Sequence, residues 1–594
     1  MVGAAVALVN EDGVFWAKGF GVADKEAGIS VTPDTLFRAG SISKSVVSLI
    51  AMRLVEEGRL DLYARLRDVA PEVEFTNKWE DEAPVRLVHL LEHTTGWDGI
   101  HPAEGRSDAE QRTIIDGLAI NPGARTSRWP PGRYPAYSNL GSVVMGHVLE
   151  KTTGEDFETL AQRYVFRPIG AETATFSQSP DTFKRLAKGY KTNGEQVNHT
   201  RTWARPSGAL QASVNDIGRL VQLHIRRGEI DGNVLLSSET MDRIERPESS
   251  AAARNGLDFG YGLGNFALLD WANGGGVYHG HDGMMDGFLA ISAYRKDAGV
   301  GFVVLLNSQN FAGYAEIQRL VQSYLAVSAP KPTFPKPGSD PHMKAYEGLY
   351  QGFTPRDEGA RMMTDMTALI SVRTSGDHLF MRNVLTGQEG KFIPVGGGRF
   401  ANVSASQADR IFYENESGEY QFTIGSNLTN STYGKVSPMK AYGTISLVIF
   451  VFICSVIAVI FTLVWTVGRL FGKFSHANRW RVWAFPMLSI TIYAGGIALS
   501  LILLMATSNR FEILGAPNIV TRIIQGCTIL PSVFAVLGLI AAFTVRNVST
   551  WARWHAGVTS LAWVALSLHH VYYNQIGLTF WAYTPPTYER YVGF

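Results

Sequence analysis

The sequence predicts an α+β domain, then a small β-rich domain, then a bundle of membrane-spanning helices. Up to residue 437 of the 594, polar and apolar positions are mixed, whereas long uncharged apolar runs follow. Prolines cluster at 330–337, which is typical of a linker. A chain of this length also exceeds the roughly 100–200 residues of one domain. We therefore expect domains at 1–330, 331–440 and 441–594.

The composition excludes some classes of partner and site. The formal net charge of +1 gives no reason to expect a nucleic acid. The only two cysteines, Cys454 and Cys527, lie in the apolar runs, so the polar part has neither a disulfide nor a cysteine metal site. We expect no metal and no cofactor, and the oligomeric state stays open.

The chain is expected to begin in a β-hairpin. Residues 1–9 lack the basic start of a secretory signal and are too short to span a membrane. They predict a strand, followed by a turn at 10–13 and a second strand at 14–21. Strands at 289–294 and 300–307 are predicted to pair later in the same domain.

A helix after Gly40 carries the first candidate functional residues. Apolar residues recur at helical spacing, at Val46, Val47, Ile50, Ala51 and Leu54. The serines before it are expected to cap its first turn with their hydroxyls. Ser41 and Lys44 share one face, and a desolvated lysine can activate a serine. The same spacing recurs at Ser437 and Lys440, where no helix or pocket is evident, so spacing alone decides nothing.

Two later segments offer partners for Ser41. A loop stiffened by proline and glycine, 129–141, precedes a helix predicted at 142–151 and carries Tyr137 and Asn139, which are expected to face one cavity. The glycine-rich segment 274–287 carries His281, where the backbone either approaches a ligand or turns tightly. His93, at the end of a predicted helix, is expected to be structural.

Ser41-x-x-Lys44, Tyr137-x-Asn139 and His281-x-Gly283 occur in this order along the chain. The order resembles the three motifs of the serine β-lactamase and penicillin-binding-protein superfamily. It is most similar to the class C β-lactamase-like serine hydrolases, which include esterases, D-amino-acid peptidases and acyltransferases. The resemblance covers about 1–325, including 90–96, 207–217 and 260–264. It implies a β-lactamase/transpeptidase-like fold, an antiparallel sheet flanked by helices.

The resemblance also implies catalytic roles. Ser41 would attack a carbonyl group to form an acyl-enzyme. Lys44 would keep the site positive and depress the pKa of Tyr137, which would take the serine proton and pass it to the leaving group. Asn139 would hold Lys44 and the substrate amide by hydrogen bonds.

The third motif implies the substrate-binding edge. The amide of Met284, after Gly283, would complete an oxyanion hole with the amide of Ser41. His281 stands where many β-lactamases and carboxypeptidases have a lysine, and a histidine is mostly neutral at pH 7. This favours an esterase, a peptidase or an acyltransferase acting on a small molecule or peptide over an efficient β-lactamase. Asp282 and Asp286 are either solvated turn residues or a site for a substrate ammonium.

Residues 331–440 contain short alternating apolar runs, which predict the strands of a small β-barrel or sandwich. The six runs lie at 346–350, 368–372, 378–381, 391–394, 410–413 and 420–422. This segment resembles the lipocalin-like appendage that follows many such hydrolase domains. We expect it to pack against the hydrolase domain or to act as a lid.

Runs without Asp, Glu, Lys or Arg occupy 443–468, 482–509, 523–545 and 554–588. About 20 apolar residues cross a bilayer, so four spanning helices are predicted, the last at 554–576 with His569 and His570 at an interface. The layout is similar to that of membrane-tethered D-amino-acid peptidases. A multi-pass cell-membrane protein in contact with lipid is therefore expected.

The basic residues between the spans predict the orientation. The first and third loops contain six, against two in the second loop: Arg469, Lys473, Arg479, Arg481, Arg546 and Arg553, against Arg510 and Arg522. The positive-inside rule places the first and third loops in the cytosol and the hydrolase domain outside, which implies that an export signal is missing from the N-terminus. Asn-x-Ser/Thr triplets fit that side, at Asn198, Asn402, Asn415, Asn427 and Asn430.

Two other classes of function stay open. One is a sensor that Ser41 acylates without turnover, reporting penicillin-like compounds through the helices. The other is a transporter or scaffold made by the helices, with the hydrolase domain as a passenger. The runs contain no acidic residue or paired charge, which disfavours transport.

Overall fold

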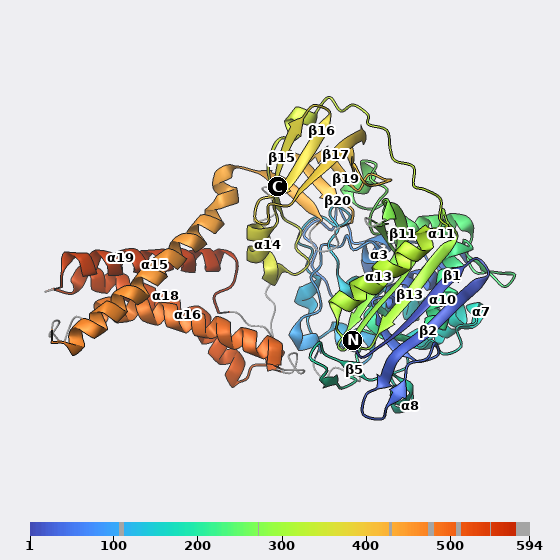
Figure 1. The fold of residues 1–594 in the computed structure, drawn as a ribbon, viewed down its shortest axis with the longest axis horizontal. Coiled ribbons are helices and arrows are strands. Elements are labelled where there is room, and N and C mark those ends of the chain that lie inside the picture. Colours follow the sequence, from blue (N-terminus) through green and yellow to red (C-terminus); the bar gives the residue numbers. More distant parts are fainter. Residues whose placement is uncertain are drawn as a thin grey trace.

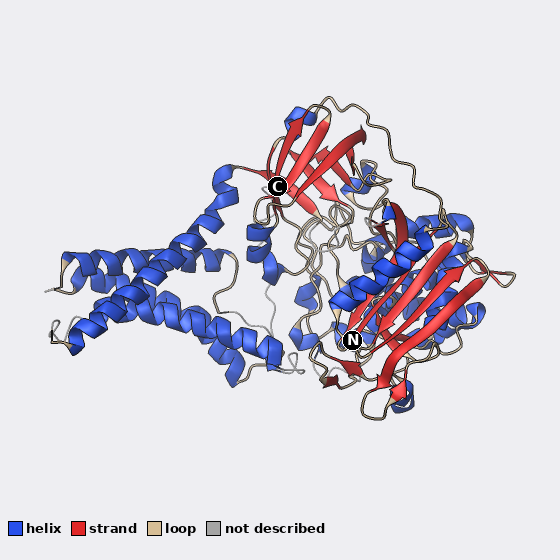
Figure 2. Ribbon diagram, in the orientation of Figure 1, coloured by secondary structure: helices blue, strands red, loops and turns tan. Residues whose placement is uncertain are grey.

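The computed structural model describes residues 1–105, 112–270, 273–426, 431–472, 480–506, 513–546 and 548–577. The N-terminal part combines a sheet with helices, and a yellow barrel lies beside it (Figure 1). Long helices project away from both (Figure 2). The chain thus passes from the α+β part through the barrel into the long helices.

A seven-stranded antiparallel sheet, in the order β10-β11-β12-β13-β1-β2-β3, forms the centre of the first part. The predicted hairpin at the N-terminus and the later strand pair are confirmed, and β1 pairs with β13 to join them. The strands are β1 (Gly3–Asn10), β2 (Gly13–Asp24), β3 (Ile29–Ser30), β10 (Phe266–Asp270), β11 (Gly276–Met285), β12 (Phe288–Arg295) and β13 (Val300–Leu306).

Strand β1 is buried on both faces. Its successive side chains point to opposite sides of the sheet, and each side packs into a different core. Ala5, Ala7 and Val9 enter the large core shared with the helical layer. Ala4, Val6 and Leu8 enter a second core. Helix α13 (Phe311–Ala326) covers that second face. The sheet therefore lies between two helical layers.

Helices and short strand pairs complete this part. The helices are α1 (Ser43–Glu56), α2 (Leu66–Val69), α3 (Leu87–Leu91), α4 (Ile114–Leu118), α5 (Asn139–Thr153), α6 (Phe157–Ala161), α7 (Arg167–Ile169), α8 (Pro180–Arg185), α9 (Arg205–Gly208), α10 (Val214–Ile225), α11 (Ser238–Glu245) and α12 (Ala251–Arg254). The paired short strands are β4 (Phe37–Gly40) with β7 (Leu210–Ala212), β5 (Gly189–Tyr190) with β6 (Gln196–Val197), and β8 (Glu229–Ile230) with β9 (Asn233–Val234).

The start of α1 differs from the prediction that serine hydroxyls cap it. Ile42 occupies the cap position and makes no side-chain capping bond. The Ser43 hydroxyl instead donates to the Gly40 carbonyl at 2.7 Å. The expected capping is therefore wrong, and the Ser41 hydroxyl stays available for other contacts.

The second part is a closed eight-stranded barrel, as one of the two predicted architectures. Aromatic rings fill it, including Tyr346, Tyr350, Phe400, Phe412 and Phe422. The six short apolar runs correspond to six of the barrel strands, and no such run predicts β18 or β21. The elements are β14 (Gly348–Gly352), α14 (Arg361–Thr367), β15 (Leu369–Ser375), β16 (His378–Asn383), β17 (Glu389–Gly396), β18 (Arg399–Asn402), β19 (Arg410–Glu414), β20 (Tyr420–Ile424) and β21 (Thr432–Val436).

The barrel packs directly on the N-terminal part beside the proline-rich loop. The Tyr134 hydroxyl donates to Gln421 Oε1 at 3.2 Å, and the Ser431 hydroxyl donates to the Pro135 carbonyl at 2.7 Å. Both contacts fall within three residues of Tyr137 along the chain. The barrel is therefore part of the surroundings of the predicted site.

The long helices are α15 (Pro438–Leu470), α16 (Trp480–Ala506), α18 (Ile519–Thr544) and α19 (Thr550–Tyr572). Among the described residues, three segments are long and apolar enough to cross a membrane, Pro438–Leu470, Trp480–Leu503 and Ile519–Thr544. The fourth predicted span forms α19, which also carries Arg553 and His555 and is not among those three. Helix α19 packs Trp563 against α15.

The second Ser-x-x-Lys sequence has a structural explanation. Ser437 caps α15 by accepting a hydrogen bond from the Lys440 amide at 3.3 Å. The expectation that no helix begins there is wrong. The same spacing thus serves an ordinary helix cap at this place.

Candidate active site

Ser41 and Lys44 meet at the start of α1, as their spacing predicts. Ser41 is half-buried in the turn between β4 and α1, and Lys44 is 1% exposed. Lys44 Nζ lies 3.0 Å from Ser41 Oγ. A buried amine therefore contacts a partly accessible hydroxyl, which is the arrangement that activates a serine nucleophile.

Lys44 Nζ has three hydrogen-bond partners around it. Its Nζ also contacts Asn139 Oδ1 at 2.9 Å and the Ser207 carbonyl oxygen at 2.7 Å, and both of these accept only. Nζ also donates to Ser41 Oγ, so the three contacts match the three hydrogens of an ammonium, and loss of one of these protons would leave a lone pair beside Ser41. Burial lowers the pKa of Lys44 well below 10.5, the Arg356 charge lowers it further, and Asp282 opposes both. Lys44 is thus equipped to accept a proton.

Tyr137 and Asn139 reach the same place from the rigid loop. Helix α5 begins at Asn139, three residues earlier than predicted, so Asn139 lies on its first turn. Lys44 Nζ lies 5.0 Å from the centre of the Tyr137 ring, and Ser41 is close enough to Tyr137 to lower its pKa. The structure thus brings together the four residues of the first two motifs.

The expectation that the pKa of Tyr137 is depressed is wrong, because Tyr137 is buried. Burial raises the pKa of Tyr137 above 10.0, and neither Ser41 nor the Arg356 charge, which lower it, reverses this. Lys44, itself with a lowered pKa, does not supply the expected depression. Tyr137 therefore stays protonated at neutral pH, and Lys44 is the better base of the two.

The backbones of β4 and β11 approach closely beside Ser41. A Cβ added at Gly40 would lie 2.7 Å from the Met284 nitrogen, and one added at Gly283 would lie 3.1 Å from the Ser41 nitrogen. Gly40 also has φ +55°, which favours glycine. The two glycines therefore let the amides of Ser41 and Met284 lie near one another.

The pairing of β11 shows where the Met284 amide points. Met285 and Phe288 close a two-residue turn as a hydrogen-bonded pair, so Met284 and Leu289 form the next, non-hydrogen-bonded pair. The Met284 N–H thus points away from β12. On that side β11 pairs with β10 only as far as Gly280. The amide is left to face the Ser41 region, as an oxyanion hole requires.

His281 supports the site from within the protein. It is fully buried, and its Nδ1–H donates to the Asp282 carbonyl at 2.5 Å. Its Nε2 therefore accepts from the Tyr261 hydroxyl at 2.9 Å. Burial is the main cause that lowers the pKa of His281 to about 3. The imidazole is neutral with both nitrogens engaged, so it offers no cation to a substrate.

His93 also has a supporting position. It has φ +56°, and its Nδ1 accepts from the Ser138 amide at 3.3 Å. Its ring centre lies 4.3 Å from that of Tyr137 and 4.5 Å from that of Tyr261. The expectation of a structural histidine fits this geometry, because the ring packs between the two tyrosines.

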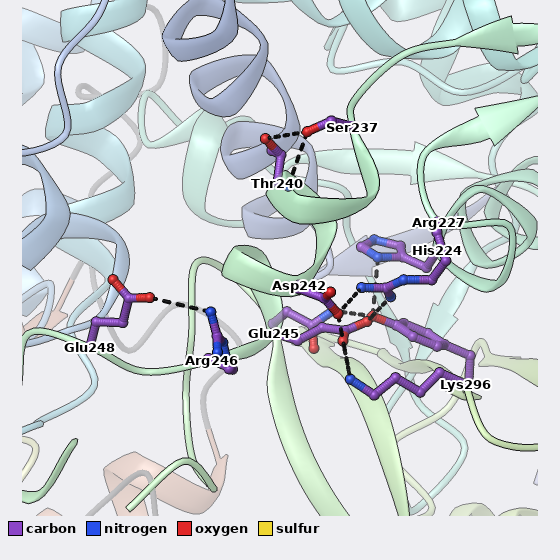
Figure 3. A network of polar contacts seen from close by, with 11 residues as sticks. His224, Arg227, Ser237, Thr240, Asp242, Glu245, Arg246, Glu248 and Lys296 are labelled. Atoms are coloured by element: carbon purple, nitrogen blue, oxygen red, sulfur yellow. Dashed lines mark hydrogen bonds and ion pairs between the residues drawn. The ribbon is translucent and has the colours of Figure 1, made fainter. Parts of the chain in front are cut away.

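Glu245 forms ion pairs with Arg227 and Lys296 in a polar network outside the site (Figure 3). The Tyr294 hydroxyl donates to Glu245 at 2.8 Å and accepts from Asn265 at 3.0 Å, and the Gly280 amide donates to Asn265 Oδ1 at 3.0 Å. Burial works to raise the pKa of Glu245, but neighbouring charges and hydrogen bonds, first His279 and then Arg227, lower it to about 2. Glu245 is therefore an ionised anchor outside the site.

Sequence reasoning missed one cation at the site. The guanidinium of Arg356, from the barrel, lies 4.8 Å from the centre of the Tyr137 ring. No motif or periodicity marks this residue, because only the packing of the two parts brings it there. Asp282 follows His281 on β11, so its 62% exposed side chain points to the opposite face of the sheet.

Within the described ranges, no group of three or more His, Cys, Asp or Glu side chains is arranged to hold a metal ion. The site itself presents a serine, an amine, a phenol and two backbone amides.

Residues 1–325 match the beta-lactamase family. Penicillin-binding protein 4 of Amycolatopsis lactamdurans is 27% identical over 315 residues, which cover 51% of this chain and 80% of that protein. Esterase EstB of Burkholderia gladioli is 31% identical over 195 residues, 31% of this chain and 49% of the esterase. A D-aminopeptidase of Gluconobacter oxydans is 29% identical over 227 residues, 36% of this chain and 41% of the aminopeptidase. The family match confirms the predicted β-lactamase/transpeptidase-like fold.

Proposed function

The chain belongs to the beta-lactamase family, whose members are serine hydrolases, and from this we propose that it is a membrane-anchored hydrolase that cleaves an ester or an amide through an acyl-enzyme on Ser41. The observation that carries the proposal is the 3.0 Å contact between the buried Lys44 Nζ and Ser41 Oγ. Burial lowers the pKa of Lys44, which favours the neutral amine, and this form can take the serine proton.

Acylation begins with this proton transfer. Ser41 Oγ loses its proton to the Lys44 lone pair and attacks the carbonyl carbon of the substrate. The negative charge that develops on the carbonyl oxygen is bound by the N–H groups of Ser41 and Met284. Asn139 holds Lys44 in position through its Oδ1.

Release of the leaving group needs an acid. Tyr137 is protonated and lies beside Ser41, so its hydroxyl gives a proton to the departing oxygen or nitrogen as the bond to carbon breaks. The proton that Lys44 took from Ser41 then moves to the Tyr137 phenolate, so both side chains end acylation in their starting protonation states. Deacylation repeats these roles, with Lys44 taking a proton from the attacking water.

Two observations support an esterase or a D-amino-acid-type peptidase. The relatives EstB and D-aminopeptidase bear the names of an esterase and an aminopeptidase. His281 is neutral and engaged, so the third motif lacks the cation expected of an efficient β-lactamase. Acyl transfer uses the same acyl-enzyme with an acceptor in place of water.

The apolar helices support attachment to a bilayer, with the hydrolase part on the non-cytoplasmic side. The three apolar segments are each long enough to span. The basic loop residues favour this orientation by the positive-inside rule. Of the residues used for it, Lys473, Arg479 and Arg510 lie outside the described residues, as do the candidate glycosylation sites Asn427 and Asn430.

The proposal is tested by activity profiling of the full chain in detergent against p-nitrophenyl esters, D- and L-aminoacyl amides and nitrocefin. We expect turnover of an ester or an aminoacyl amide, which Ser41→Ala abolishes. Label that persists on the protein after the acyl donor is removed indicates a sensor instead. Hydrolysis by Ser41→Ala at the wild-type rate contradicts the site.

A further inference from the structure

The barrel sends one loop, residues 353–360, into the hydrolase part. Phe353 packs edge-on against Tyr134, with ring centres 5.0 Å apart. The Glu358 amide donates to Asp98 Oδ1 at 3.1 Å. These contacts lie on both sides of Arg356 in the chain, so the backbone that carries Arg356 is held at both ends.

Buried charges anchor the same loop. Arg128 is 2% exposed, and its Nη1 lies 3.5 Å from Glu358 Oε2 and 3.9 Å from Asp98 Oδ1. Its Nη2 donates to the Arg356 carbonyl at 3.4 Å. These contacts connect the loop of the barrel to Asp98 and Arg128 of the N-terminal part. These contacts hold the backbone of Arg356 in a position from which its side chain reaches the ring of Tyr137.

Among the described residues the Arg356 guanidinium has no direct carboxylate partner, although its charge acts on the carboxyl groups of Asp282 and Asp357. In the part of the chain that the structure describes, its Nε is buried without a hydrogen-bond partner, and no carboxylate forms an ion pair with it. Its charge acts on Lys44, Tyr137 and Asp282. An unpaired guanidinium at a site is suited to a ligand carboxylate, which it binds through two parallel N–H···O bonds.

We propose that Arg356 binds a carboxylate on the leaving group of the substrate, so that the preferred substrates are acylated amino acids or peptides with a free carboxylate next to the scissile bond. This inference rests on the proposed function. Arg356 lies on the leaving-group side of the site, because its guanidinium lies over the ring of Tyr137, the phenol that protonates the leaving group. Arg356 forms no covalent bond and supplies a cation that His281 cannot.

The test uses two substrates that share one acyl group and differ only in the leaving group, an alanine with a free carboxylate or its primary amide. Both enantiomers are assayed with the full chain in detergent. We expect wild type to prefer the acid by roughly 10- to 100-fold in kcat/KM, as for one charge-assisted pair. Arg356→Ala removes this preference, mostly through KM. Arg356→Lys restores part of it, since lysine keeps the charge but not the fork.

Arg382→Ala is the matched control, because it removes the same charge from an exposed position on β16 and is expected to keep the wild-type preference. Equal rates of wild type on both substrates overturn the proposal. An Arg356→Ala variant that lowers kcat/KM for both substrates by the same factor also overturns it. That result would mean that Arg356 acts on Lys44 and Tyr137 rather than on a substrate carboxylate. Labelling of Ser41 by a neutral ester reports the proposed function separately, since it needs no carboxylate.

Discussion

Replacing Gly283 with alanine tests the oxyanion hole through one methyl group. The added Cβ would lie 1.9 Å from the Ala39 carbonyl oxygen and 3.1 Å from the Ser41 nitrogen. A contact of 1.9 Å cannot persist, and its neighbour is backbone rather than a flexible side chain. Strands β4 and β11 must therefore move apart by about 1 Å to restore van der Waals distance.

The size of the effect follows from that separation. Oxyanion donors act within about 2.7–3.1 Å of the developing charge, so a shift of about 1 Å leaves only one amide in reach. Loss of one donor lowers kcat by roughly 10²- to 10³-fold. KM should change much less, because the ground-state carbonyl depends less on these two amides than the transition state does.

The assay is steady-state hydrolysis of the ester that wild type turns over best. Gly359→Ala is the control, because a Cβ there meets no atom within 4 Å. We expect it to keep wild-type kcat and both variants to keep the wild-type near-UV circular dichroism. A folded Gly283→Ala variant with kcat within threefold of wild type refutes the assignment of the Ser41 and Met284 amides.

Three further predictions concern charge. Lys44→Arg, which is always protonated, should lower kcat/KM by roughly 10²- to 10⁴-fold and abolish the rise of activity with pH that a neutral Lys44 causes, measured as a pH–rate profile. Glu245→Gln should lower the free energy of unfolding by about 3 kcal/mol at pH 7. The pKa of Glu245 is about 2 in the folded protein and 4.5 in the unfolded chain, so this stabilisation is present above pH 4.5 and disappears as pH falls toward 2. Urea unfolding of wild type and Glu245→Gln at several pH values should show that the difference between their free energies of unfolding shrinks as pH falls. Arg128→Met should cost about 3–5 kcal/mol by leaving Asp98 and Glu358 without their arginine, measured as a lower Tm and faster proteolysis of the linker at 330–337.

The sequence order of the motifs was sufficient to predict which residues meet. Ser41 and Lys44 are local neighbours on a helix, and Tyr137 and Asn139 enter the same place from a rigid loop. The protonation states were not predictable in the same way. Burial decides both the lowered pKa of Lys44 and the raised pKa of Tyr137, and burial depends on packing that spacing does not encode.

The position of Arg356 could not be predicted from the sequence either. Arg356 lies on an irregular loop of a different part of the chain, and its position over Tyr137 follows from contacts such as Arg128 with Glu358. In the barrel, β18 (Arg399–Asn402) is short and follows three consecutive glycines, so its alternating pattern is too brief to predict a strand. Long periodic segments such as α1 and the apolar helices were the easiest to predict.

The most direct test of the Ser41 assignment is to locate the acyl group on the protein. The full chain is mixed with a p-nitrophenyl ester, quenched in acid during turnover, digested and analysed by mass spectrometry. We predict an added mass equal to the acyl group on the peptide that contains Ser41, and no such mass on that peptide in Ser41→Ala. An acyl group found on another residue, with unchanged turnover by Ser41→Ala, would contradict the account.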